Sequence, residues 1–164
     1  MDKDYETLYS EQGYTAVEVG VLALPELYVA ENELMLDGIY TYNQREYFPV
    51  TGLVTEDNLQ YDENDADNVY FTASLINIGR KSSGRIDYSA YSKNMVVRAY
   101  TVYENEKGER VTIYTEQQKA NVFDVVYAIL NAPQSDADKE AAEAAIANCT
   151  AEYEAWVAEN HPAE

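Results

Sequence analysis

The sequence contains very few of the residues on which catalysis most often depends. Its 164 residues include one cysteine, Cys149, and one histidine, His161. A single cysteine excludes an intrachain disulfide and a zinc cluster built from cysteines. Any catalytic arrangement that needs histidine would have to use His161, which lies near the end of the chain where we expect fraying. We therefore expect no enzymatic activity.

Basic residues are also scarce. Eleven Lys and Arg residues stand against thirty Asp and Glu residues, which gives a net charge of −19. This charge repels the phosphate backbone of nucleic acids and anionic lipids, so neither is expected as a partner. It favours basic protein partners or cations.

Long apolar runs and the features of a signal peptide are missing from the sequence. No apolar stretch approaches the roughly 18 residues that span a bilayer, so we expect no membrane insertion. The first residues, MDKDYETLYSEQGY, are acidic and lack the basic and apolar regions of a secretory signal. Either the chain is not exported by that route, or it is a piece of a longer exported protein.

What the sequence does contain is a sizeable hydrophobic fraction, 46%, much of it in alternating patterns. Residues 15–24, TAVEVGVLAL, alternate, with Val17, Val19 and Val21 on one face, and are followed by Pro25, which predicts a strand. The same pattern predicts further strands at residues 38–49, 69–78, 95–103 and 110–116. The last two form a hairpin, in which Gly108 supplies a positive φ. The acidic run at 56–68 is predicted to be a loop.

After residue 120 the apolar spacing becomes helical. Residues 121–130 predict a helix with Asn121 as its N-cap, and Ser135 with Asp138 predicts the start of a longer helix at 135–159. One stripe of this second helix is apolar and is expected to be buried: Ala142, Ile146, Cys149, Tyr153, Trp156 and Val157.

Together these patterns predict a mainly β protein, an immunoglobulin-like β-sandwich of about seven strands with two C-terminal helices. Residues 1–14 are expected to be a flexible N-terminal segment. Residues 15–131 would form the sandwich module with a docked helix, and residues 135–159 the C-terminal helix.

A series of short motifs follows along the chain. They lie at Glu18, Gly20 and Leu22; Leu34, Leu36 and Asp37; Phe71, Thr72, Ala73, Leu75 and Ile78; Arg98, Ala99, Tyr100 and Tyr103; Gly108; Ile113, Tyr114 and Thr115; and 121–126. Their order resembles that of a module that recurs in large surface and secreted proteins of Gram-positive gut bacteria. That module has E-x-G-x-L, L-x-L-D, F-T-A-x-L-x-x-I, R-A-Y-x-x-Y, I-Y-[ST] and V-x-D-V segments, in this order.

The resemblance implies a non-catalytic structural or interaction module of a protein that is secreted or lies at the bacterial cell surface. The module's usual first strand, with a G-[IL]-R-F-like sequence, is not found, and the chain after residue 130 lies outside the pattern. A missing first strand would leave a sheet edge open to another chain. The alternative is a virion component of a gut-bacterial phage, a capsid decoration or fibre protein that assembles through this edge or the C-terminal helix.

A third hypothesis is a carbohydrate-binding module, because exposed aromatic rings stack on sugars and the chain has sixteen tyrosines. These tyrosines are spread along the predicted strands, however, and cross-strand packing accounts for them equally well.

One segment has the composition of a calcium loop. Asp62, Asn64, Asp65 and Asp67 carry the hard oxygen donors that calcium prefers, although the spacing is not that of an EF-hand. A solvated acidic loop is the alternative.

Arg98 is the most unusual residue of the predicted strands. It alternates with Val96, Tyr100 and Val102 in a strand that is apolar on both faces, so it is expected to be buried. A buried guanidinium needs acceptors or an aromatic face, and Glu18 or Asp124 are the candidate acids. We expect Arg98, with Tyr100, Tyr103, Gly108 and Tyr114, to hold the module together.

Overall fold

The computed structural model describes residues 9–55, 59–61, 69–71, 78–133 and 135–162. The chain divides into two compact units, which we call the sheet unit and the helical unit. The sheet unit comprises residues 1–75 and 96–118, and the helical unit comprises residues 76–95 and 119–164.

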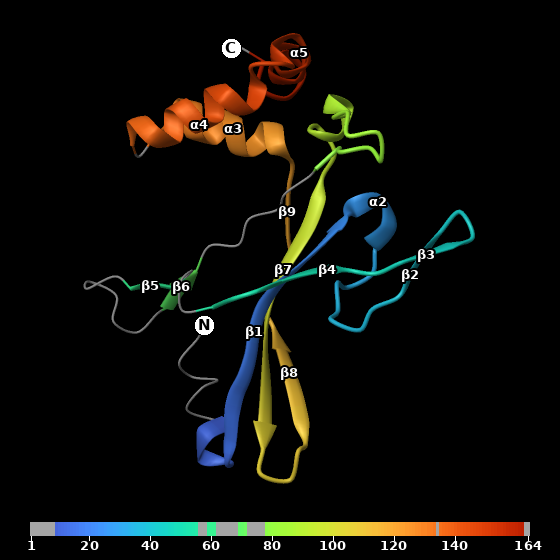
Figure 1. The fold of residues 1–164 in the computed structure, drawn as a ribbon, viewed down its shortest axis with the longest axis vertical. Helices are drawn as coiled ribbons and strands as arrows, with labels where there is room; N and C mark the ends of the chain where they lie inside the picture. The colour runs from blue at the N-terminus through green and yellow to red at the C-terminus, as the bar shows by residue number, and fades with distance from the viewer. Residues whose placement is uncertain (1–8, 56–58, 62–68, 72–77, 134, 163–164) are drawn as a thin grey trace. The chain divides into compact units, whose positions relative to one another are not determined.

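The sheet unit is built on long strands that follow the predicted alternation. In Figure 1, β1 runs beside β7, and β7 beside β8, in the strand order β4-β1-β7-β8. A short fifth strand, β9, also pairs with β7. β1 pairs antiparallel with β4, and β7 pairs antiparallel with β8. The strands are β1 (Tyr14–Pro25), β4 (Val50–Leu53), β7 (Met95–Asn105), β8 (Arg110–Tyr114) and β9 (Gln118–Ala120).

Two further strand pairs are small and separate from this sheet. They are β2 (Tyr40–Tyr42) with β3 (Arg45–Tyr47), and β5 (Leu59–Tyr61) with β6 (Val69–Phe71). The short helix α2 (Glu26–Val29) directly follows Pro25, whose φ of −53° is compatible with a helix start.

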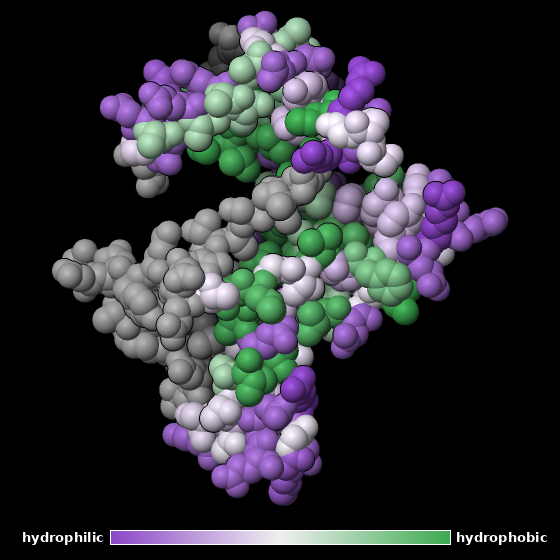
Figure 2. All heavy atoms as spheres, in the orientation of Figure 1, coloured by the Kyte–Doolittle hydropathy of each residue, from purple (hydrophilic) through white to green (hydrophobic). Residues whose placement is uncertain are grey.

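The core of the sheet unit lies on one face of the sheet. Every second residue of β1 and β7 points to this face. On β1 the residues that reach the core are Leu22 and Leu24. The alternating Val17, Val19 and Val21 lie on the opposite face of the strand, where Val17 is 50% exposed. The buried side chains that form this core cluster are Leu22, Leu24, Val29, Leu34, Tyr40, Val96, Tyr100 and Val102. Figure 2 shows hydrophilic residues around the β7–β8 turn and hydrophobic residues gathered toward the middle of β1 and over β4.

The helical unit consists of α3 (Val122–Asn131), α4 (Asp136–Ile146) and α5 (Thr150–Asn160), together with the 3-10 turn η2 (Tyr88–Ala90). Both predicted N-caps are confirmed, since Asn121 accepts from Asp124 N and Ser135 accepts from Asp138 N. The core contains Phe123, Val126, Ala142, Ile146, Cys149, Tyr153 and Trp156.

The helix predicted at 135–159 is wrong as a single helix. α4 ends at Ile146, residues 147–149 form a turn, and α5 begins at Thr150. Ala147 and Cys149 close the turn by donating backbone bonds to Ala144 O and Ile146 O. The predicted apolar stripe is nevertheless buried, apart from the half-buried Val157, because the short turn keeps both helices facing one core.

The single strand predicted at 38–49 is also wrong. The chain turns back at Asn43 and Gln44, which have φ values of 48° and 62°, and the two halves pair as β2 and β3. Two positive φ angles are what a two-residue hairpin loop of type I′ requires, although Gln is an unusual residue there.

The predicted loop at 56–68 contains a strand, β5. Of the strand predicted at 69–78, the first three residues form β6 and Ile78 lies in a turn, whereas 72–77 lie outside the described residues. Tyr9 belongs to the expected flexible segment 1–14, yet its ring stacks on Tyr103 with centroids 4.8 Å apart.

The predicted fold class is only partly confirmed. The chain has an antiparallel sheet, but the described residues hold helix and strand in similar amounts, so "mainly β" is not confirmed. A second sheet packed face to face on the first, as a sandwich requires, is not seen among them. α3 is grouped with α4 and α5, whereas the sequence grouped it with the preceding strands.

Among the described residues, no helix is both long and apolar enough to cross a membrane.

Candidate functional site

The best-defined polar site of the sheet unit surrounds the Arg98 guanidinium. The side chain of Arg98 is 13% exposed, and it joins two backbone segments that lie far apart in the sequence. Its Nε donates to Thr115 O at 2.7 Å, just beyond β8, and its Nη1 donates to Leu34 O at 3.2 Å. Its guanidinium carbon lies 4.7 Å from the centre of the Tyr114 ring. The expected position of Arg98 along a tyrosine is confirmed, whereas the residue is half-buried and not fully buried as expected.

The acid that meets Arg98 is Glu33, at 3.1 Å, and neither Glu18 nor Asp124. Glu18 accepts from Tyr100 instead, and Asp124 accepts from the backbone of Asn121. The Glu33 side chain is 73% exposed, so this ion pair contributes little to stability. The two carbonyl bonds and the ring contact are the stronger part of the site.

Glu18, Gly20 and Tyr100 form the second part of this site. Tyr100 is 2% exposed, and its hydroxyl donates to Glu18 Oε1 at 2.6 Å. A Cβ at position 20 would lie 2.6 Å from this hydroxyl oxygen and 2.7 Å from two ring carbons. Gly20 thus leaves the space that the Tyr100 ring fills. Burial, and secondarily the bond to Glu18, raises the pKa of Tyr100.

The segment 33–36 is held by side chains that sequence reasoning missed as well as by Arg98. The Tyr40 hydroxyl donates to Glu33 O at 2.7 Å and accepts from Met35 N at 2.8 Å. Tyr114, which was predicted to be structural, accepts from Leu36 N at 3.1 Å. Gln117 accepts from Leu34 N at 3.1 Å. Nothing in the spacing of Tyr40 and Gln117 marks them as partners of this segment.

The remaining predicted structural residues lie along the β7–β8 hairpin. Tyr103 is 1% exposed, and Gly108 has a φ of 78°. The positive φ expected at Gly108 is therefore confirmed. Asn105 accepts from Lys107 N and Glu109 N, each at 3.0 Å, and so holds the loop around Gly108 closed.

The candidate calcium ligands Asp62, Asn64, Asp65 and Asp67 lie outside the described residues. Within the described ranges, no three His, Cys, Asp or Glu side chains gather in a way that would hold a metal ion.

His161 and Cys149 have neighbours that account for them structurally. The His161 ring stacks on Tyr127 with centroids 3.8 Å apart. This residue is therefore packed against α3, whereas its position near the chain end predicted fraying. Cys149 is 1% exposed, and burial, aided by the Glu152 carboxylate, raises the pKa of its thiol. A raised pKa disfavours the thiolate that a nucleophile or metal ligand needs.

Three of the tyrosines cluster in space, whereas their positions along the sequence suggested an even spread over the strands. Tyr28 of α2 stacks on Tyr47 of β3 with centroids 3.8 Å apart, and Tyr42 of β2 lies 5.6 Å from Tyr28. All three are half-buried and pack at the β2–β3 hairpin. Because Tyr28 and Tyr47 cover one another's faces, the cluster stabilises the hairpin more than it offers a platform for a sugar.

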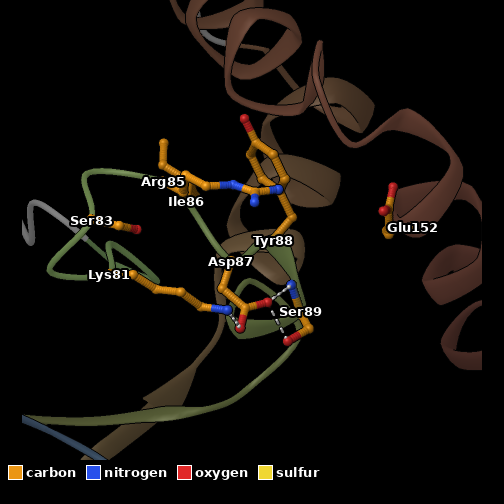
Figure 3. Close-up of a pocket in the computed structure, with 8 residues that line it drawn as sticks. All are labelled: Lys81, Ser83, Arg85, Ile86, Asp87, Tyr88, Ser89 and Glu152. Atoms are coloured by element: carbon orange, nitrogen blue, oxygen red, sulfur yellow. Dashed lines mark hydrogen bonds and ion pairs between the residues drawn. The ribbon is translucent and has the colours of Figure 1, made fainter.

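The helical unit carries an open pocket of about 410 Å³. Lys81, Arg85, Asp87, Tyr88 and Ser89 line it from one segment, and Glu152 lines it from α5 (Figure 3). Lys81 pairs with Asp87 at 3.1 Å. Asp87 also accepts from Ser89 Oγ at 2.7 Å and from Ser89 N at 3.2 Å. The bonds from Ser89, followed by those from Lys81, lower the pKa of Asp87 to about 2.

No protein-family model, curated protein or solved structure matches this chain at a significant level.

Proposed function

We propose that the chain is a non-catalytic structural and interaction module of a bacterial protein that is secreted or displayed at the cell surface, organised as an immunoglobulin-like sandwich. The observation that carries this proposal is that side chains at the positions that match the module bond to other parts of the chain. Arg98, Glu18 and Tyr100 all bond within the sheet unit, where they tie distant segments together. A spacer or interaction domain needs such a rigid frame.

The second part of the motif is used in the same way. Tyr114 bonds to the Leu36 backbone, and Gly20 gives room to the Tyr100 ring. Asn121 and Asp124 cap the start of α3 through reciprocal bonds. These roles support a motif that preserves architecture, and the chemistry of each residue is explained without a substrate.

Within this proposal, the surface that meets a partner is β4. It lies at one end of the strand path β4-β1-β7-β8, and all four of its residues are exposed. Val50 and Leu53 are 62% and 57% exposed. An exposed apolar strand at the end of a sheet favours pairing with a strand of another chain.

The coding sequence around this chain tests the proposed context. A surface or secreted protein predicts one reading frame that continues into an export signal and further modules. A reading frame that holds this chain alone, among genes for capsid proteins, would contradict the proposal and would favour the virion component instead.

A further inference from the structure

The segment that supplies most of the pocket lining in the helical unit differs in charge from the rest of the chain. Residues 78–95 contain four cations, Arg80, Lys81, Arg85 and Lys93, against one anion, Asp87, which gives a local charge of +3. The whole chain carries −19. A cationic segment in so acidic a chain is a local feature that its overall composition does not explain.

This segment is fixed against the helices, so the pocket wall is preorganised. Tyr88 and Tyr91 pack against the core of the helical unit. Phe123 N donates to Tyr91 O at 3.2 Å, and Asn121 donates to Asn94 Oδ1 at 3.1 Å. A preformed wall lowers the entropic cost of binding a ligand.

Pairing within the pocket leaves one charge of each sign. Lys81 and Asp87 neutralise one another, and Ser89 holds the second oxygen of Asp87. Arg85 and Glu152 remain, and among the described residues neither makes an ion pair. Figure 3 shows Arg85 reaching from its loop toward the side of the pocket on which Glu152 lies, with no bond between them.

We propose that this pocket binds a small zwitterion whose carboxylate and ammonium are held apart, of which a short unblocked peptide is the simplest form. Arg85 takes the carboxylate, for which the guanidinium fork is suited. Glu152 takes the ammonium. Tyr88 and Ile86 supply apolar contact for the stem between the two charges, and Ser83 and Ser89 supply hydroxyl groups.

The size and balance of the pocket favour this class of ligand over simple ions. About 410 Å³ lies within the range of roughly 300–1,000 Å³ that is typical of small-molecule sites. A lone anion would be attracted by Arg85 but repelled by the carboxylate of Glu152. A lone cation would be attracted by Glu152 but repelled by Arg85. The binding assigned to this pocket does not depend on the function proposed for the sheet unit.

Titration of the whole ¹⁵N-labelled chain with diglycine and triglycine, followed by NMR, tests the proposal. We expect saturable shifts at millimolar peptide, centred on residues 81–89 and the start of α5. N-acetyl-diglycine lacks the ammonium and diglycine amide lacks the carboxylate, so each should bind about tenfold more weakly.

The variants Arg85→Gln and Glu152→Gln should each weaken binding by about tenfold. Lys93→Gln and Glu154→Gln are matched controls. Each substitution removes one charge of the same sign from the same segment or helix, at an exposed residue that does not line the pocket. They should leave the affinity unchanged. The proposal is overturned if neither peptide shifts these signals, if a blocked peptide binds as tightly, or if the control variants weaken binding as much.

Discussion

At the scale of single residues, the side chains of the motif depend on one another across long sequence distances. Glu18 and Gly20 lie on β1 and Tyr100 lies on β7, yet one accepts the Tyr100 hydroxyl and the other makes room for its ring. The same ring belongs to the core of the sheet unit. A change at any of the three positions therefore disturbs the other two.

Replacing Gly20 with alanine should destabilise the sheet unit. The added Cβ would overlap the Tyr100 ring, and overpacking of this kind typically costs about 1–3 kcal/mol. Gly52→Ala is the matched control, because a Cβ there meets only Val21 O at 4.0 Å. Urea unfolding of both variants measures the difference. Equal stability of the two variants would refute the close approach.

The Tyr100 hydroxyl predicts a loss of stability at alkaline pH. Because its pKa is raised in the folded state, the unfolded chain ionises first, near the usual tyrosine value of about 10. Stability from this group is complete below that pH and is lost as the pH rises further.

Tyr100→Phe removes this contribution. The variant should be less stable than wild type at neutral pH, and the gap should narrow as the pH rises above about 10. Urea unfolding at neutral and alkaline pH measures both curves. A gap that stays constant with pH would show that ionisation of Tyr100 is not coupled to folding.

At the scale of elements, the residue at position 44 of the β2–β3 turn is not the one that best suits the turn's backbone geometry. Gln44 has a φ of 62°, a conformation that costs an L-residue roughly 1–2 kcal/mol and glycine very little. Gln44→Gly should therefore raise the unfolding free energy by up to about 1 kcal/mol. Thr41→Gly, in the adjacent strand, should lower it. Thermal unfolding compares the two, and equal destabilisation by both would contradict the turn.

The elements that alternation or capping marks were predictable from the sequence. β1, the β7–β8 hairpin and the start of α3 follow from valine spacing, Gly108 and Asn121. The β2–β3 turn was missed because its central residues, Asn43 and Gln44, include no glycine. The break at 147–149 was missed because the apolar stripe keeps its helical spacing across it.

The site was predictable only in its central residue. That Arg98 would be largely withdrawn from solvent followed from the strand pattern, because the strand is apolar on both faces, although the residue is only half-buried. Its acid could not be identified, because Glu33 lies 65 positions away in a segment without periodicity. The hydrogen bonds of Tyr40 and Gln117 to the same segment likewise depend on the tertiary fold, so they could not be predicted.

At the scale of the whole molecule, charge and the apolar strand β4 act against each other. A net charge of −19 makes two copies repel, whereas the exposed Val50 and Leu53 favour strand pairing. Because salt screens the repulsion and leaves apolar contacts intact, we expect self-association to increase with salt and protein concentration.

Size-exclusion chromatography with light scattering measures this association. Leu53→Lys should abolish it, because a lysine on an exposed strand opposes pairing. Leu27→Lys is the control, because Leu27 is 59% exposed on α2 and its replacement by lysine adds the same charge away from β4. A chain that remains monomeric at high salt, or that loses association equally in both variants, would exclude self-pairing through β4.

Thermal unfolding of Arg98→Lys tests most directly whether Arg98 holds the sheet unit together through its carbonyl and ring contacts. Lysine keeps the charge but loses the fork that joins Thr115 O to Leu34 O, so we expect a loss of about 1–3 kcal/mol. Glu33→Gln removes only the exposed ion pair and should cost less than about 1 kcal/mol. An unchanged melting temperature for Arg98→Lys would contradict the account.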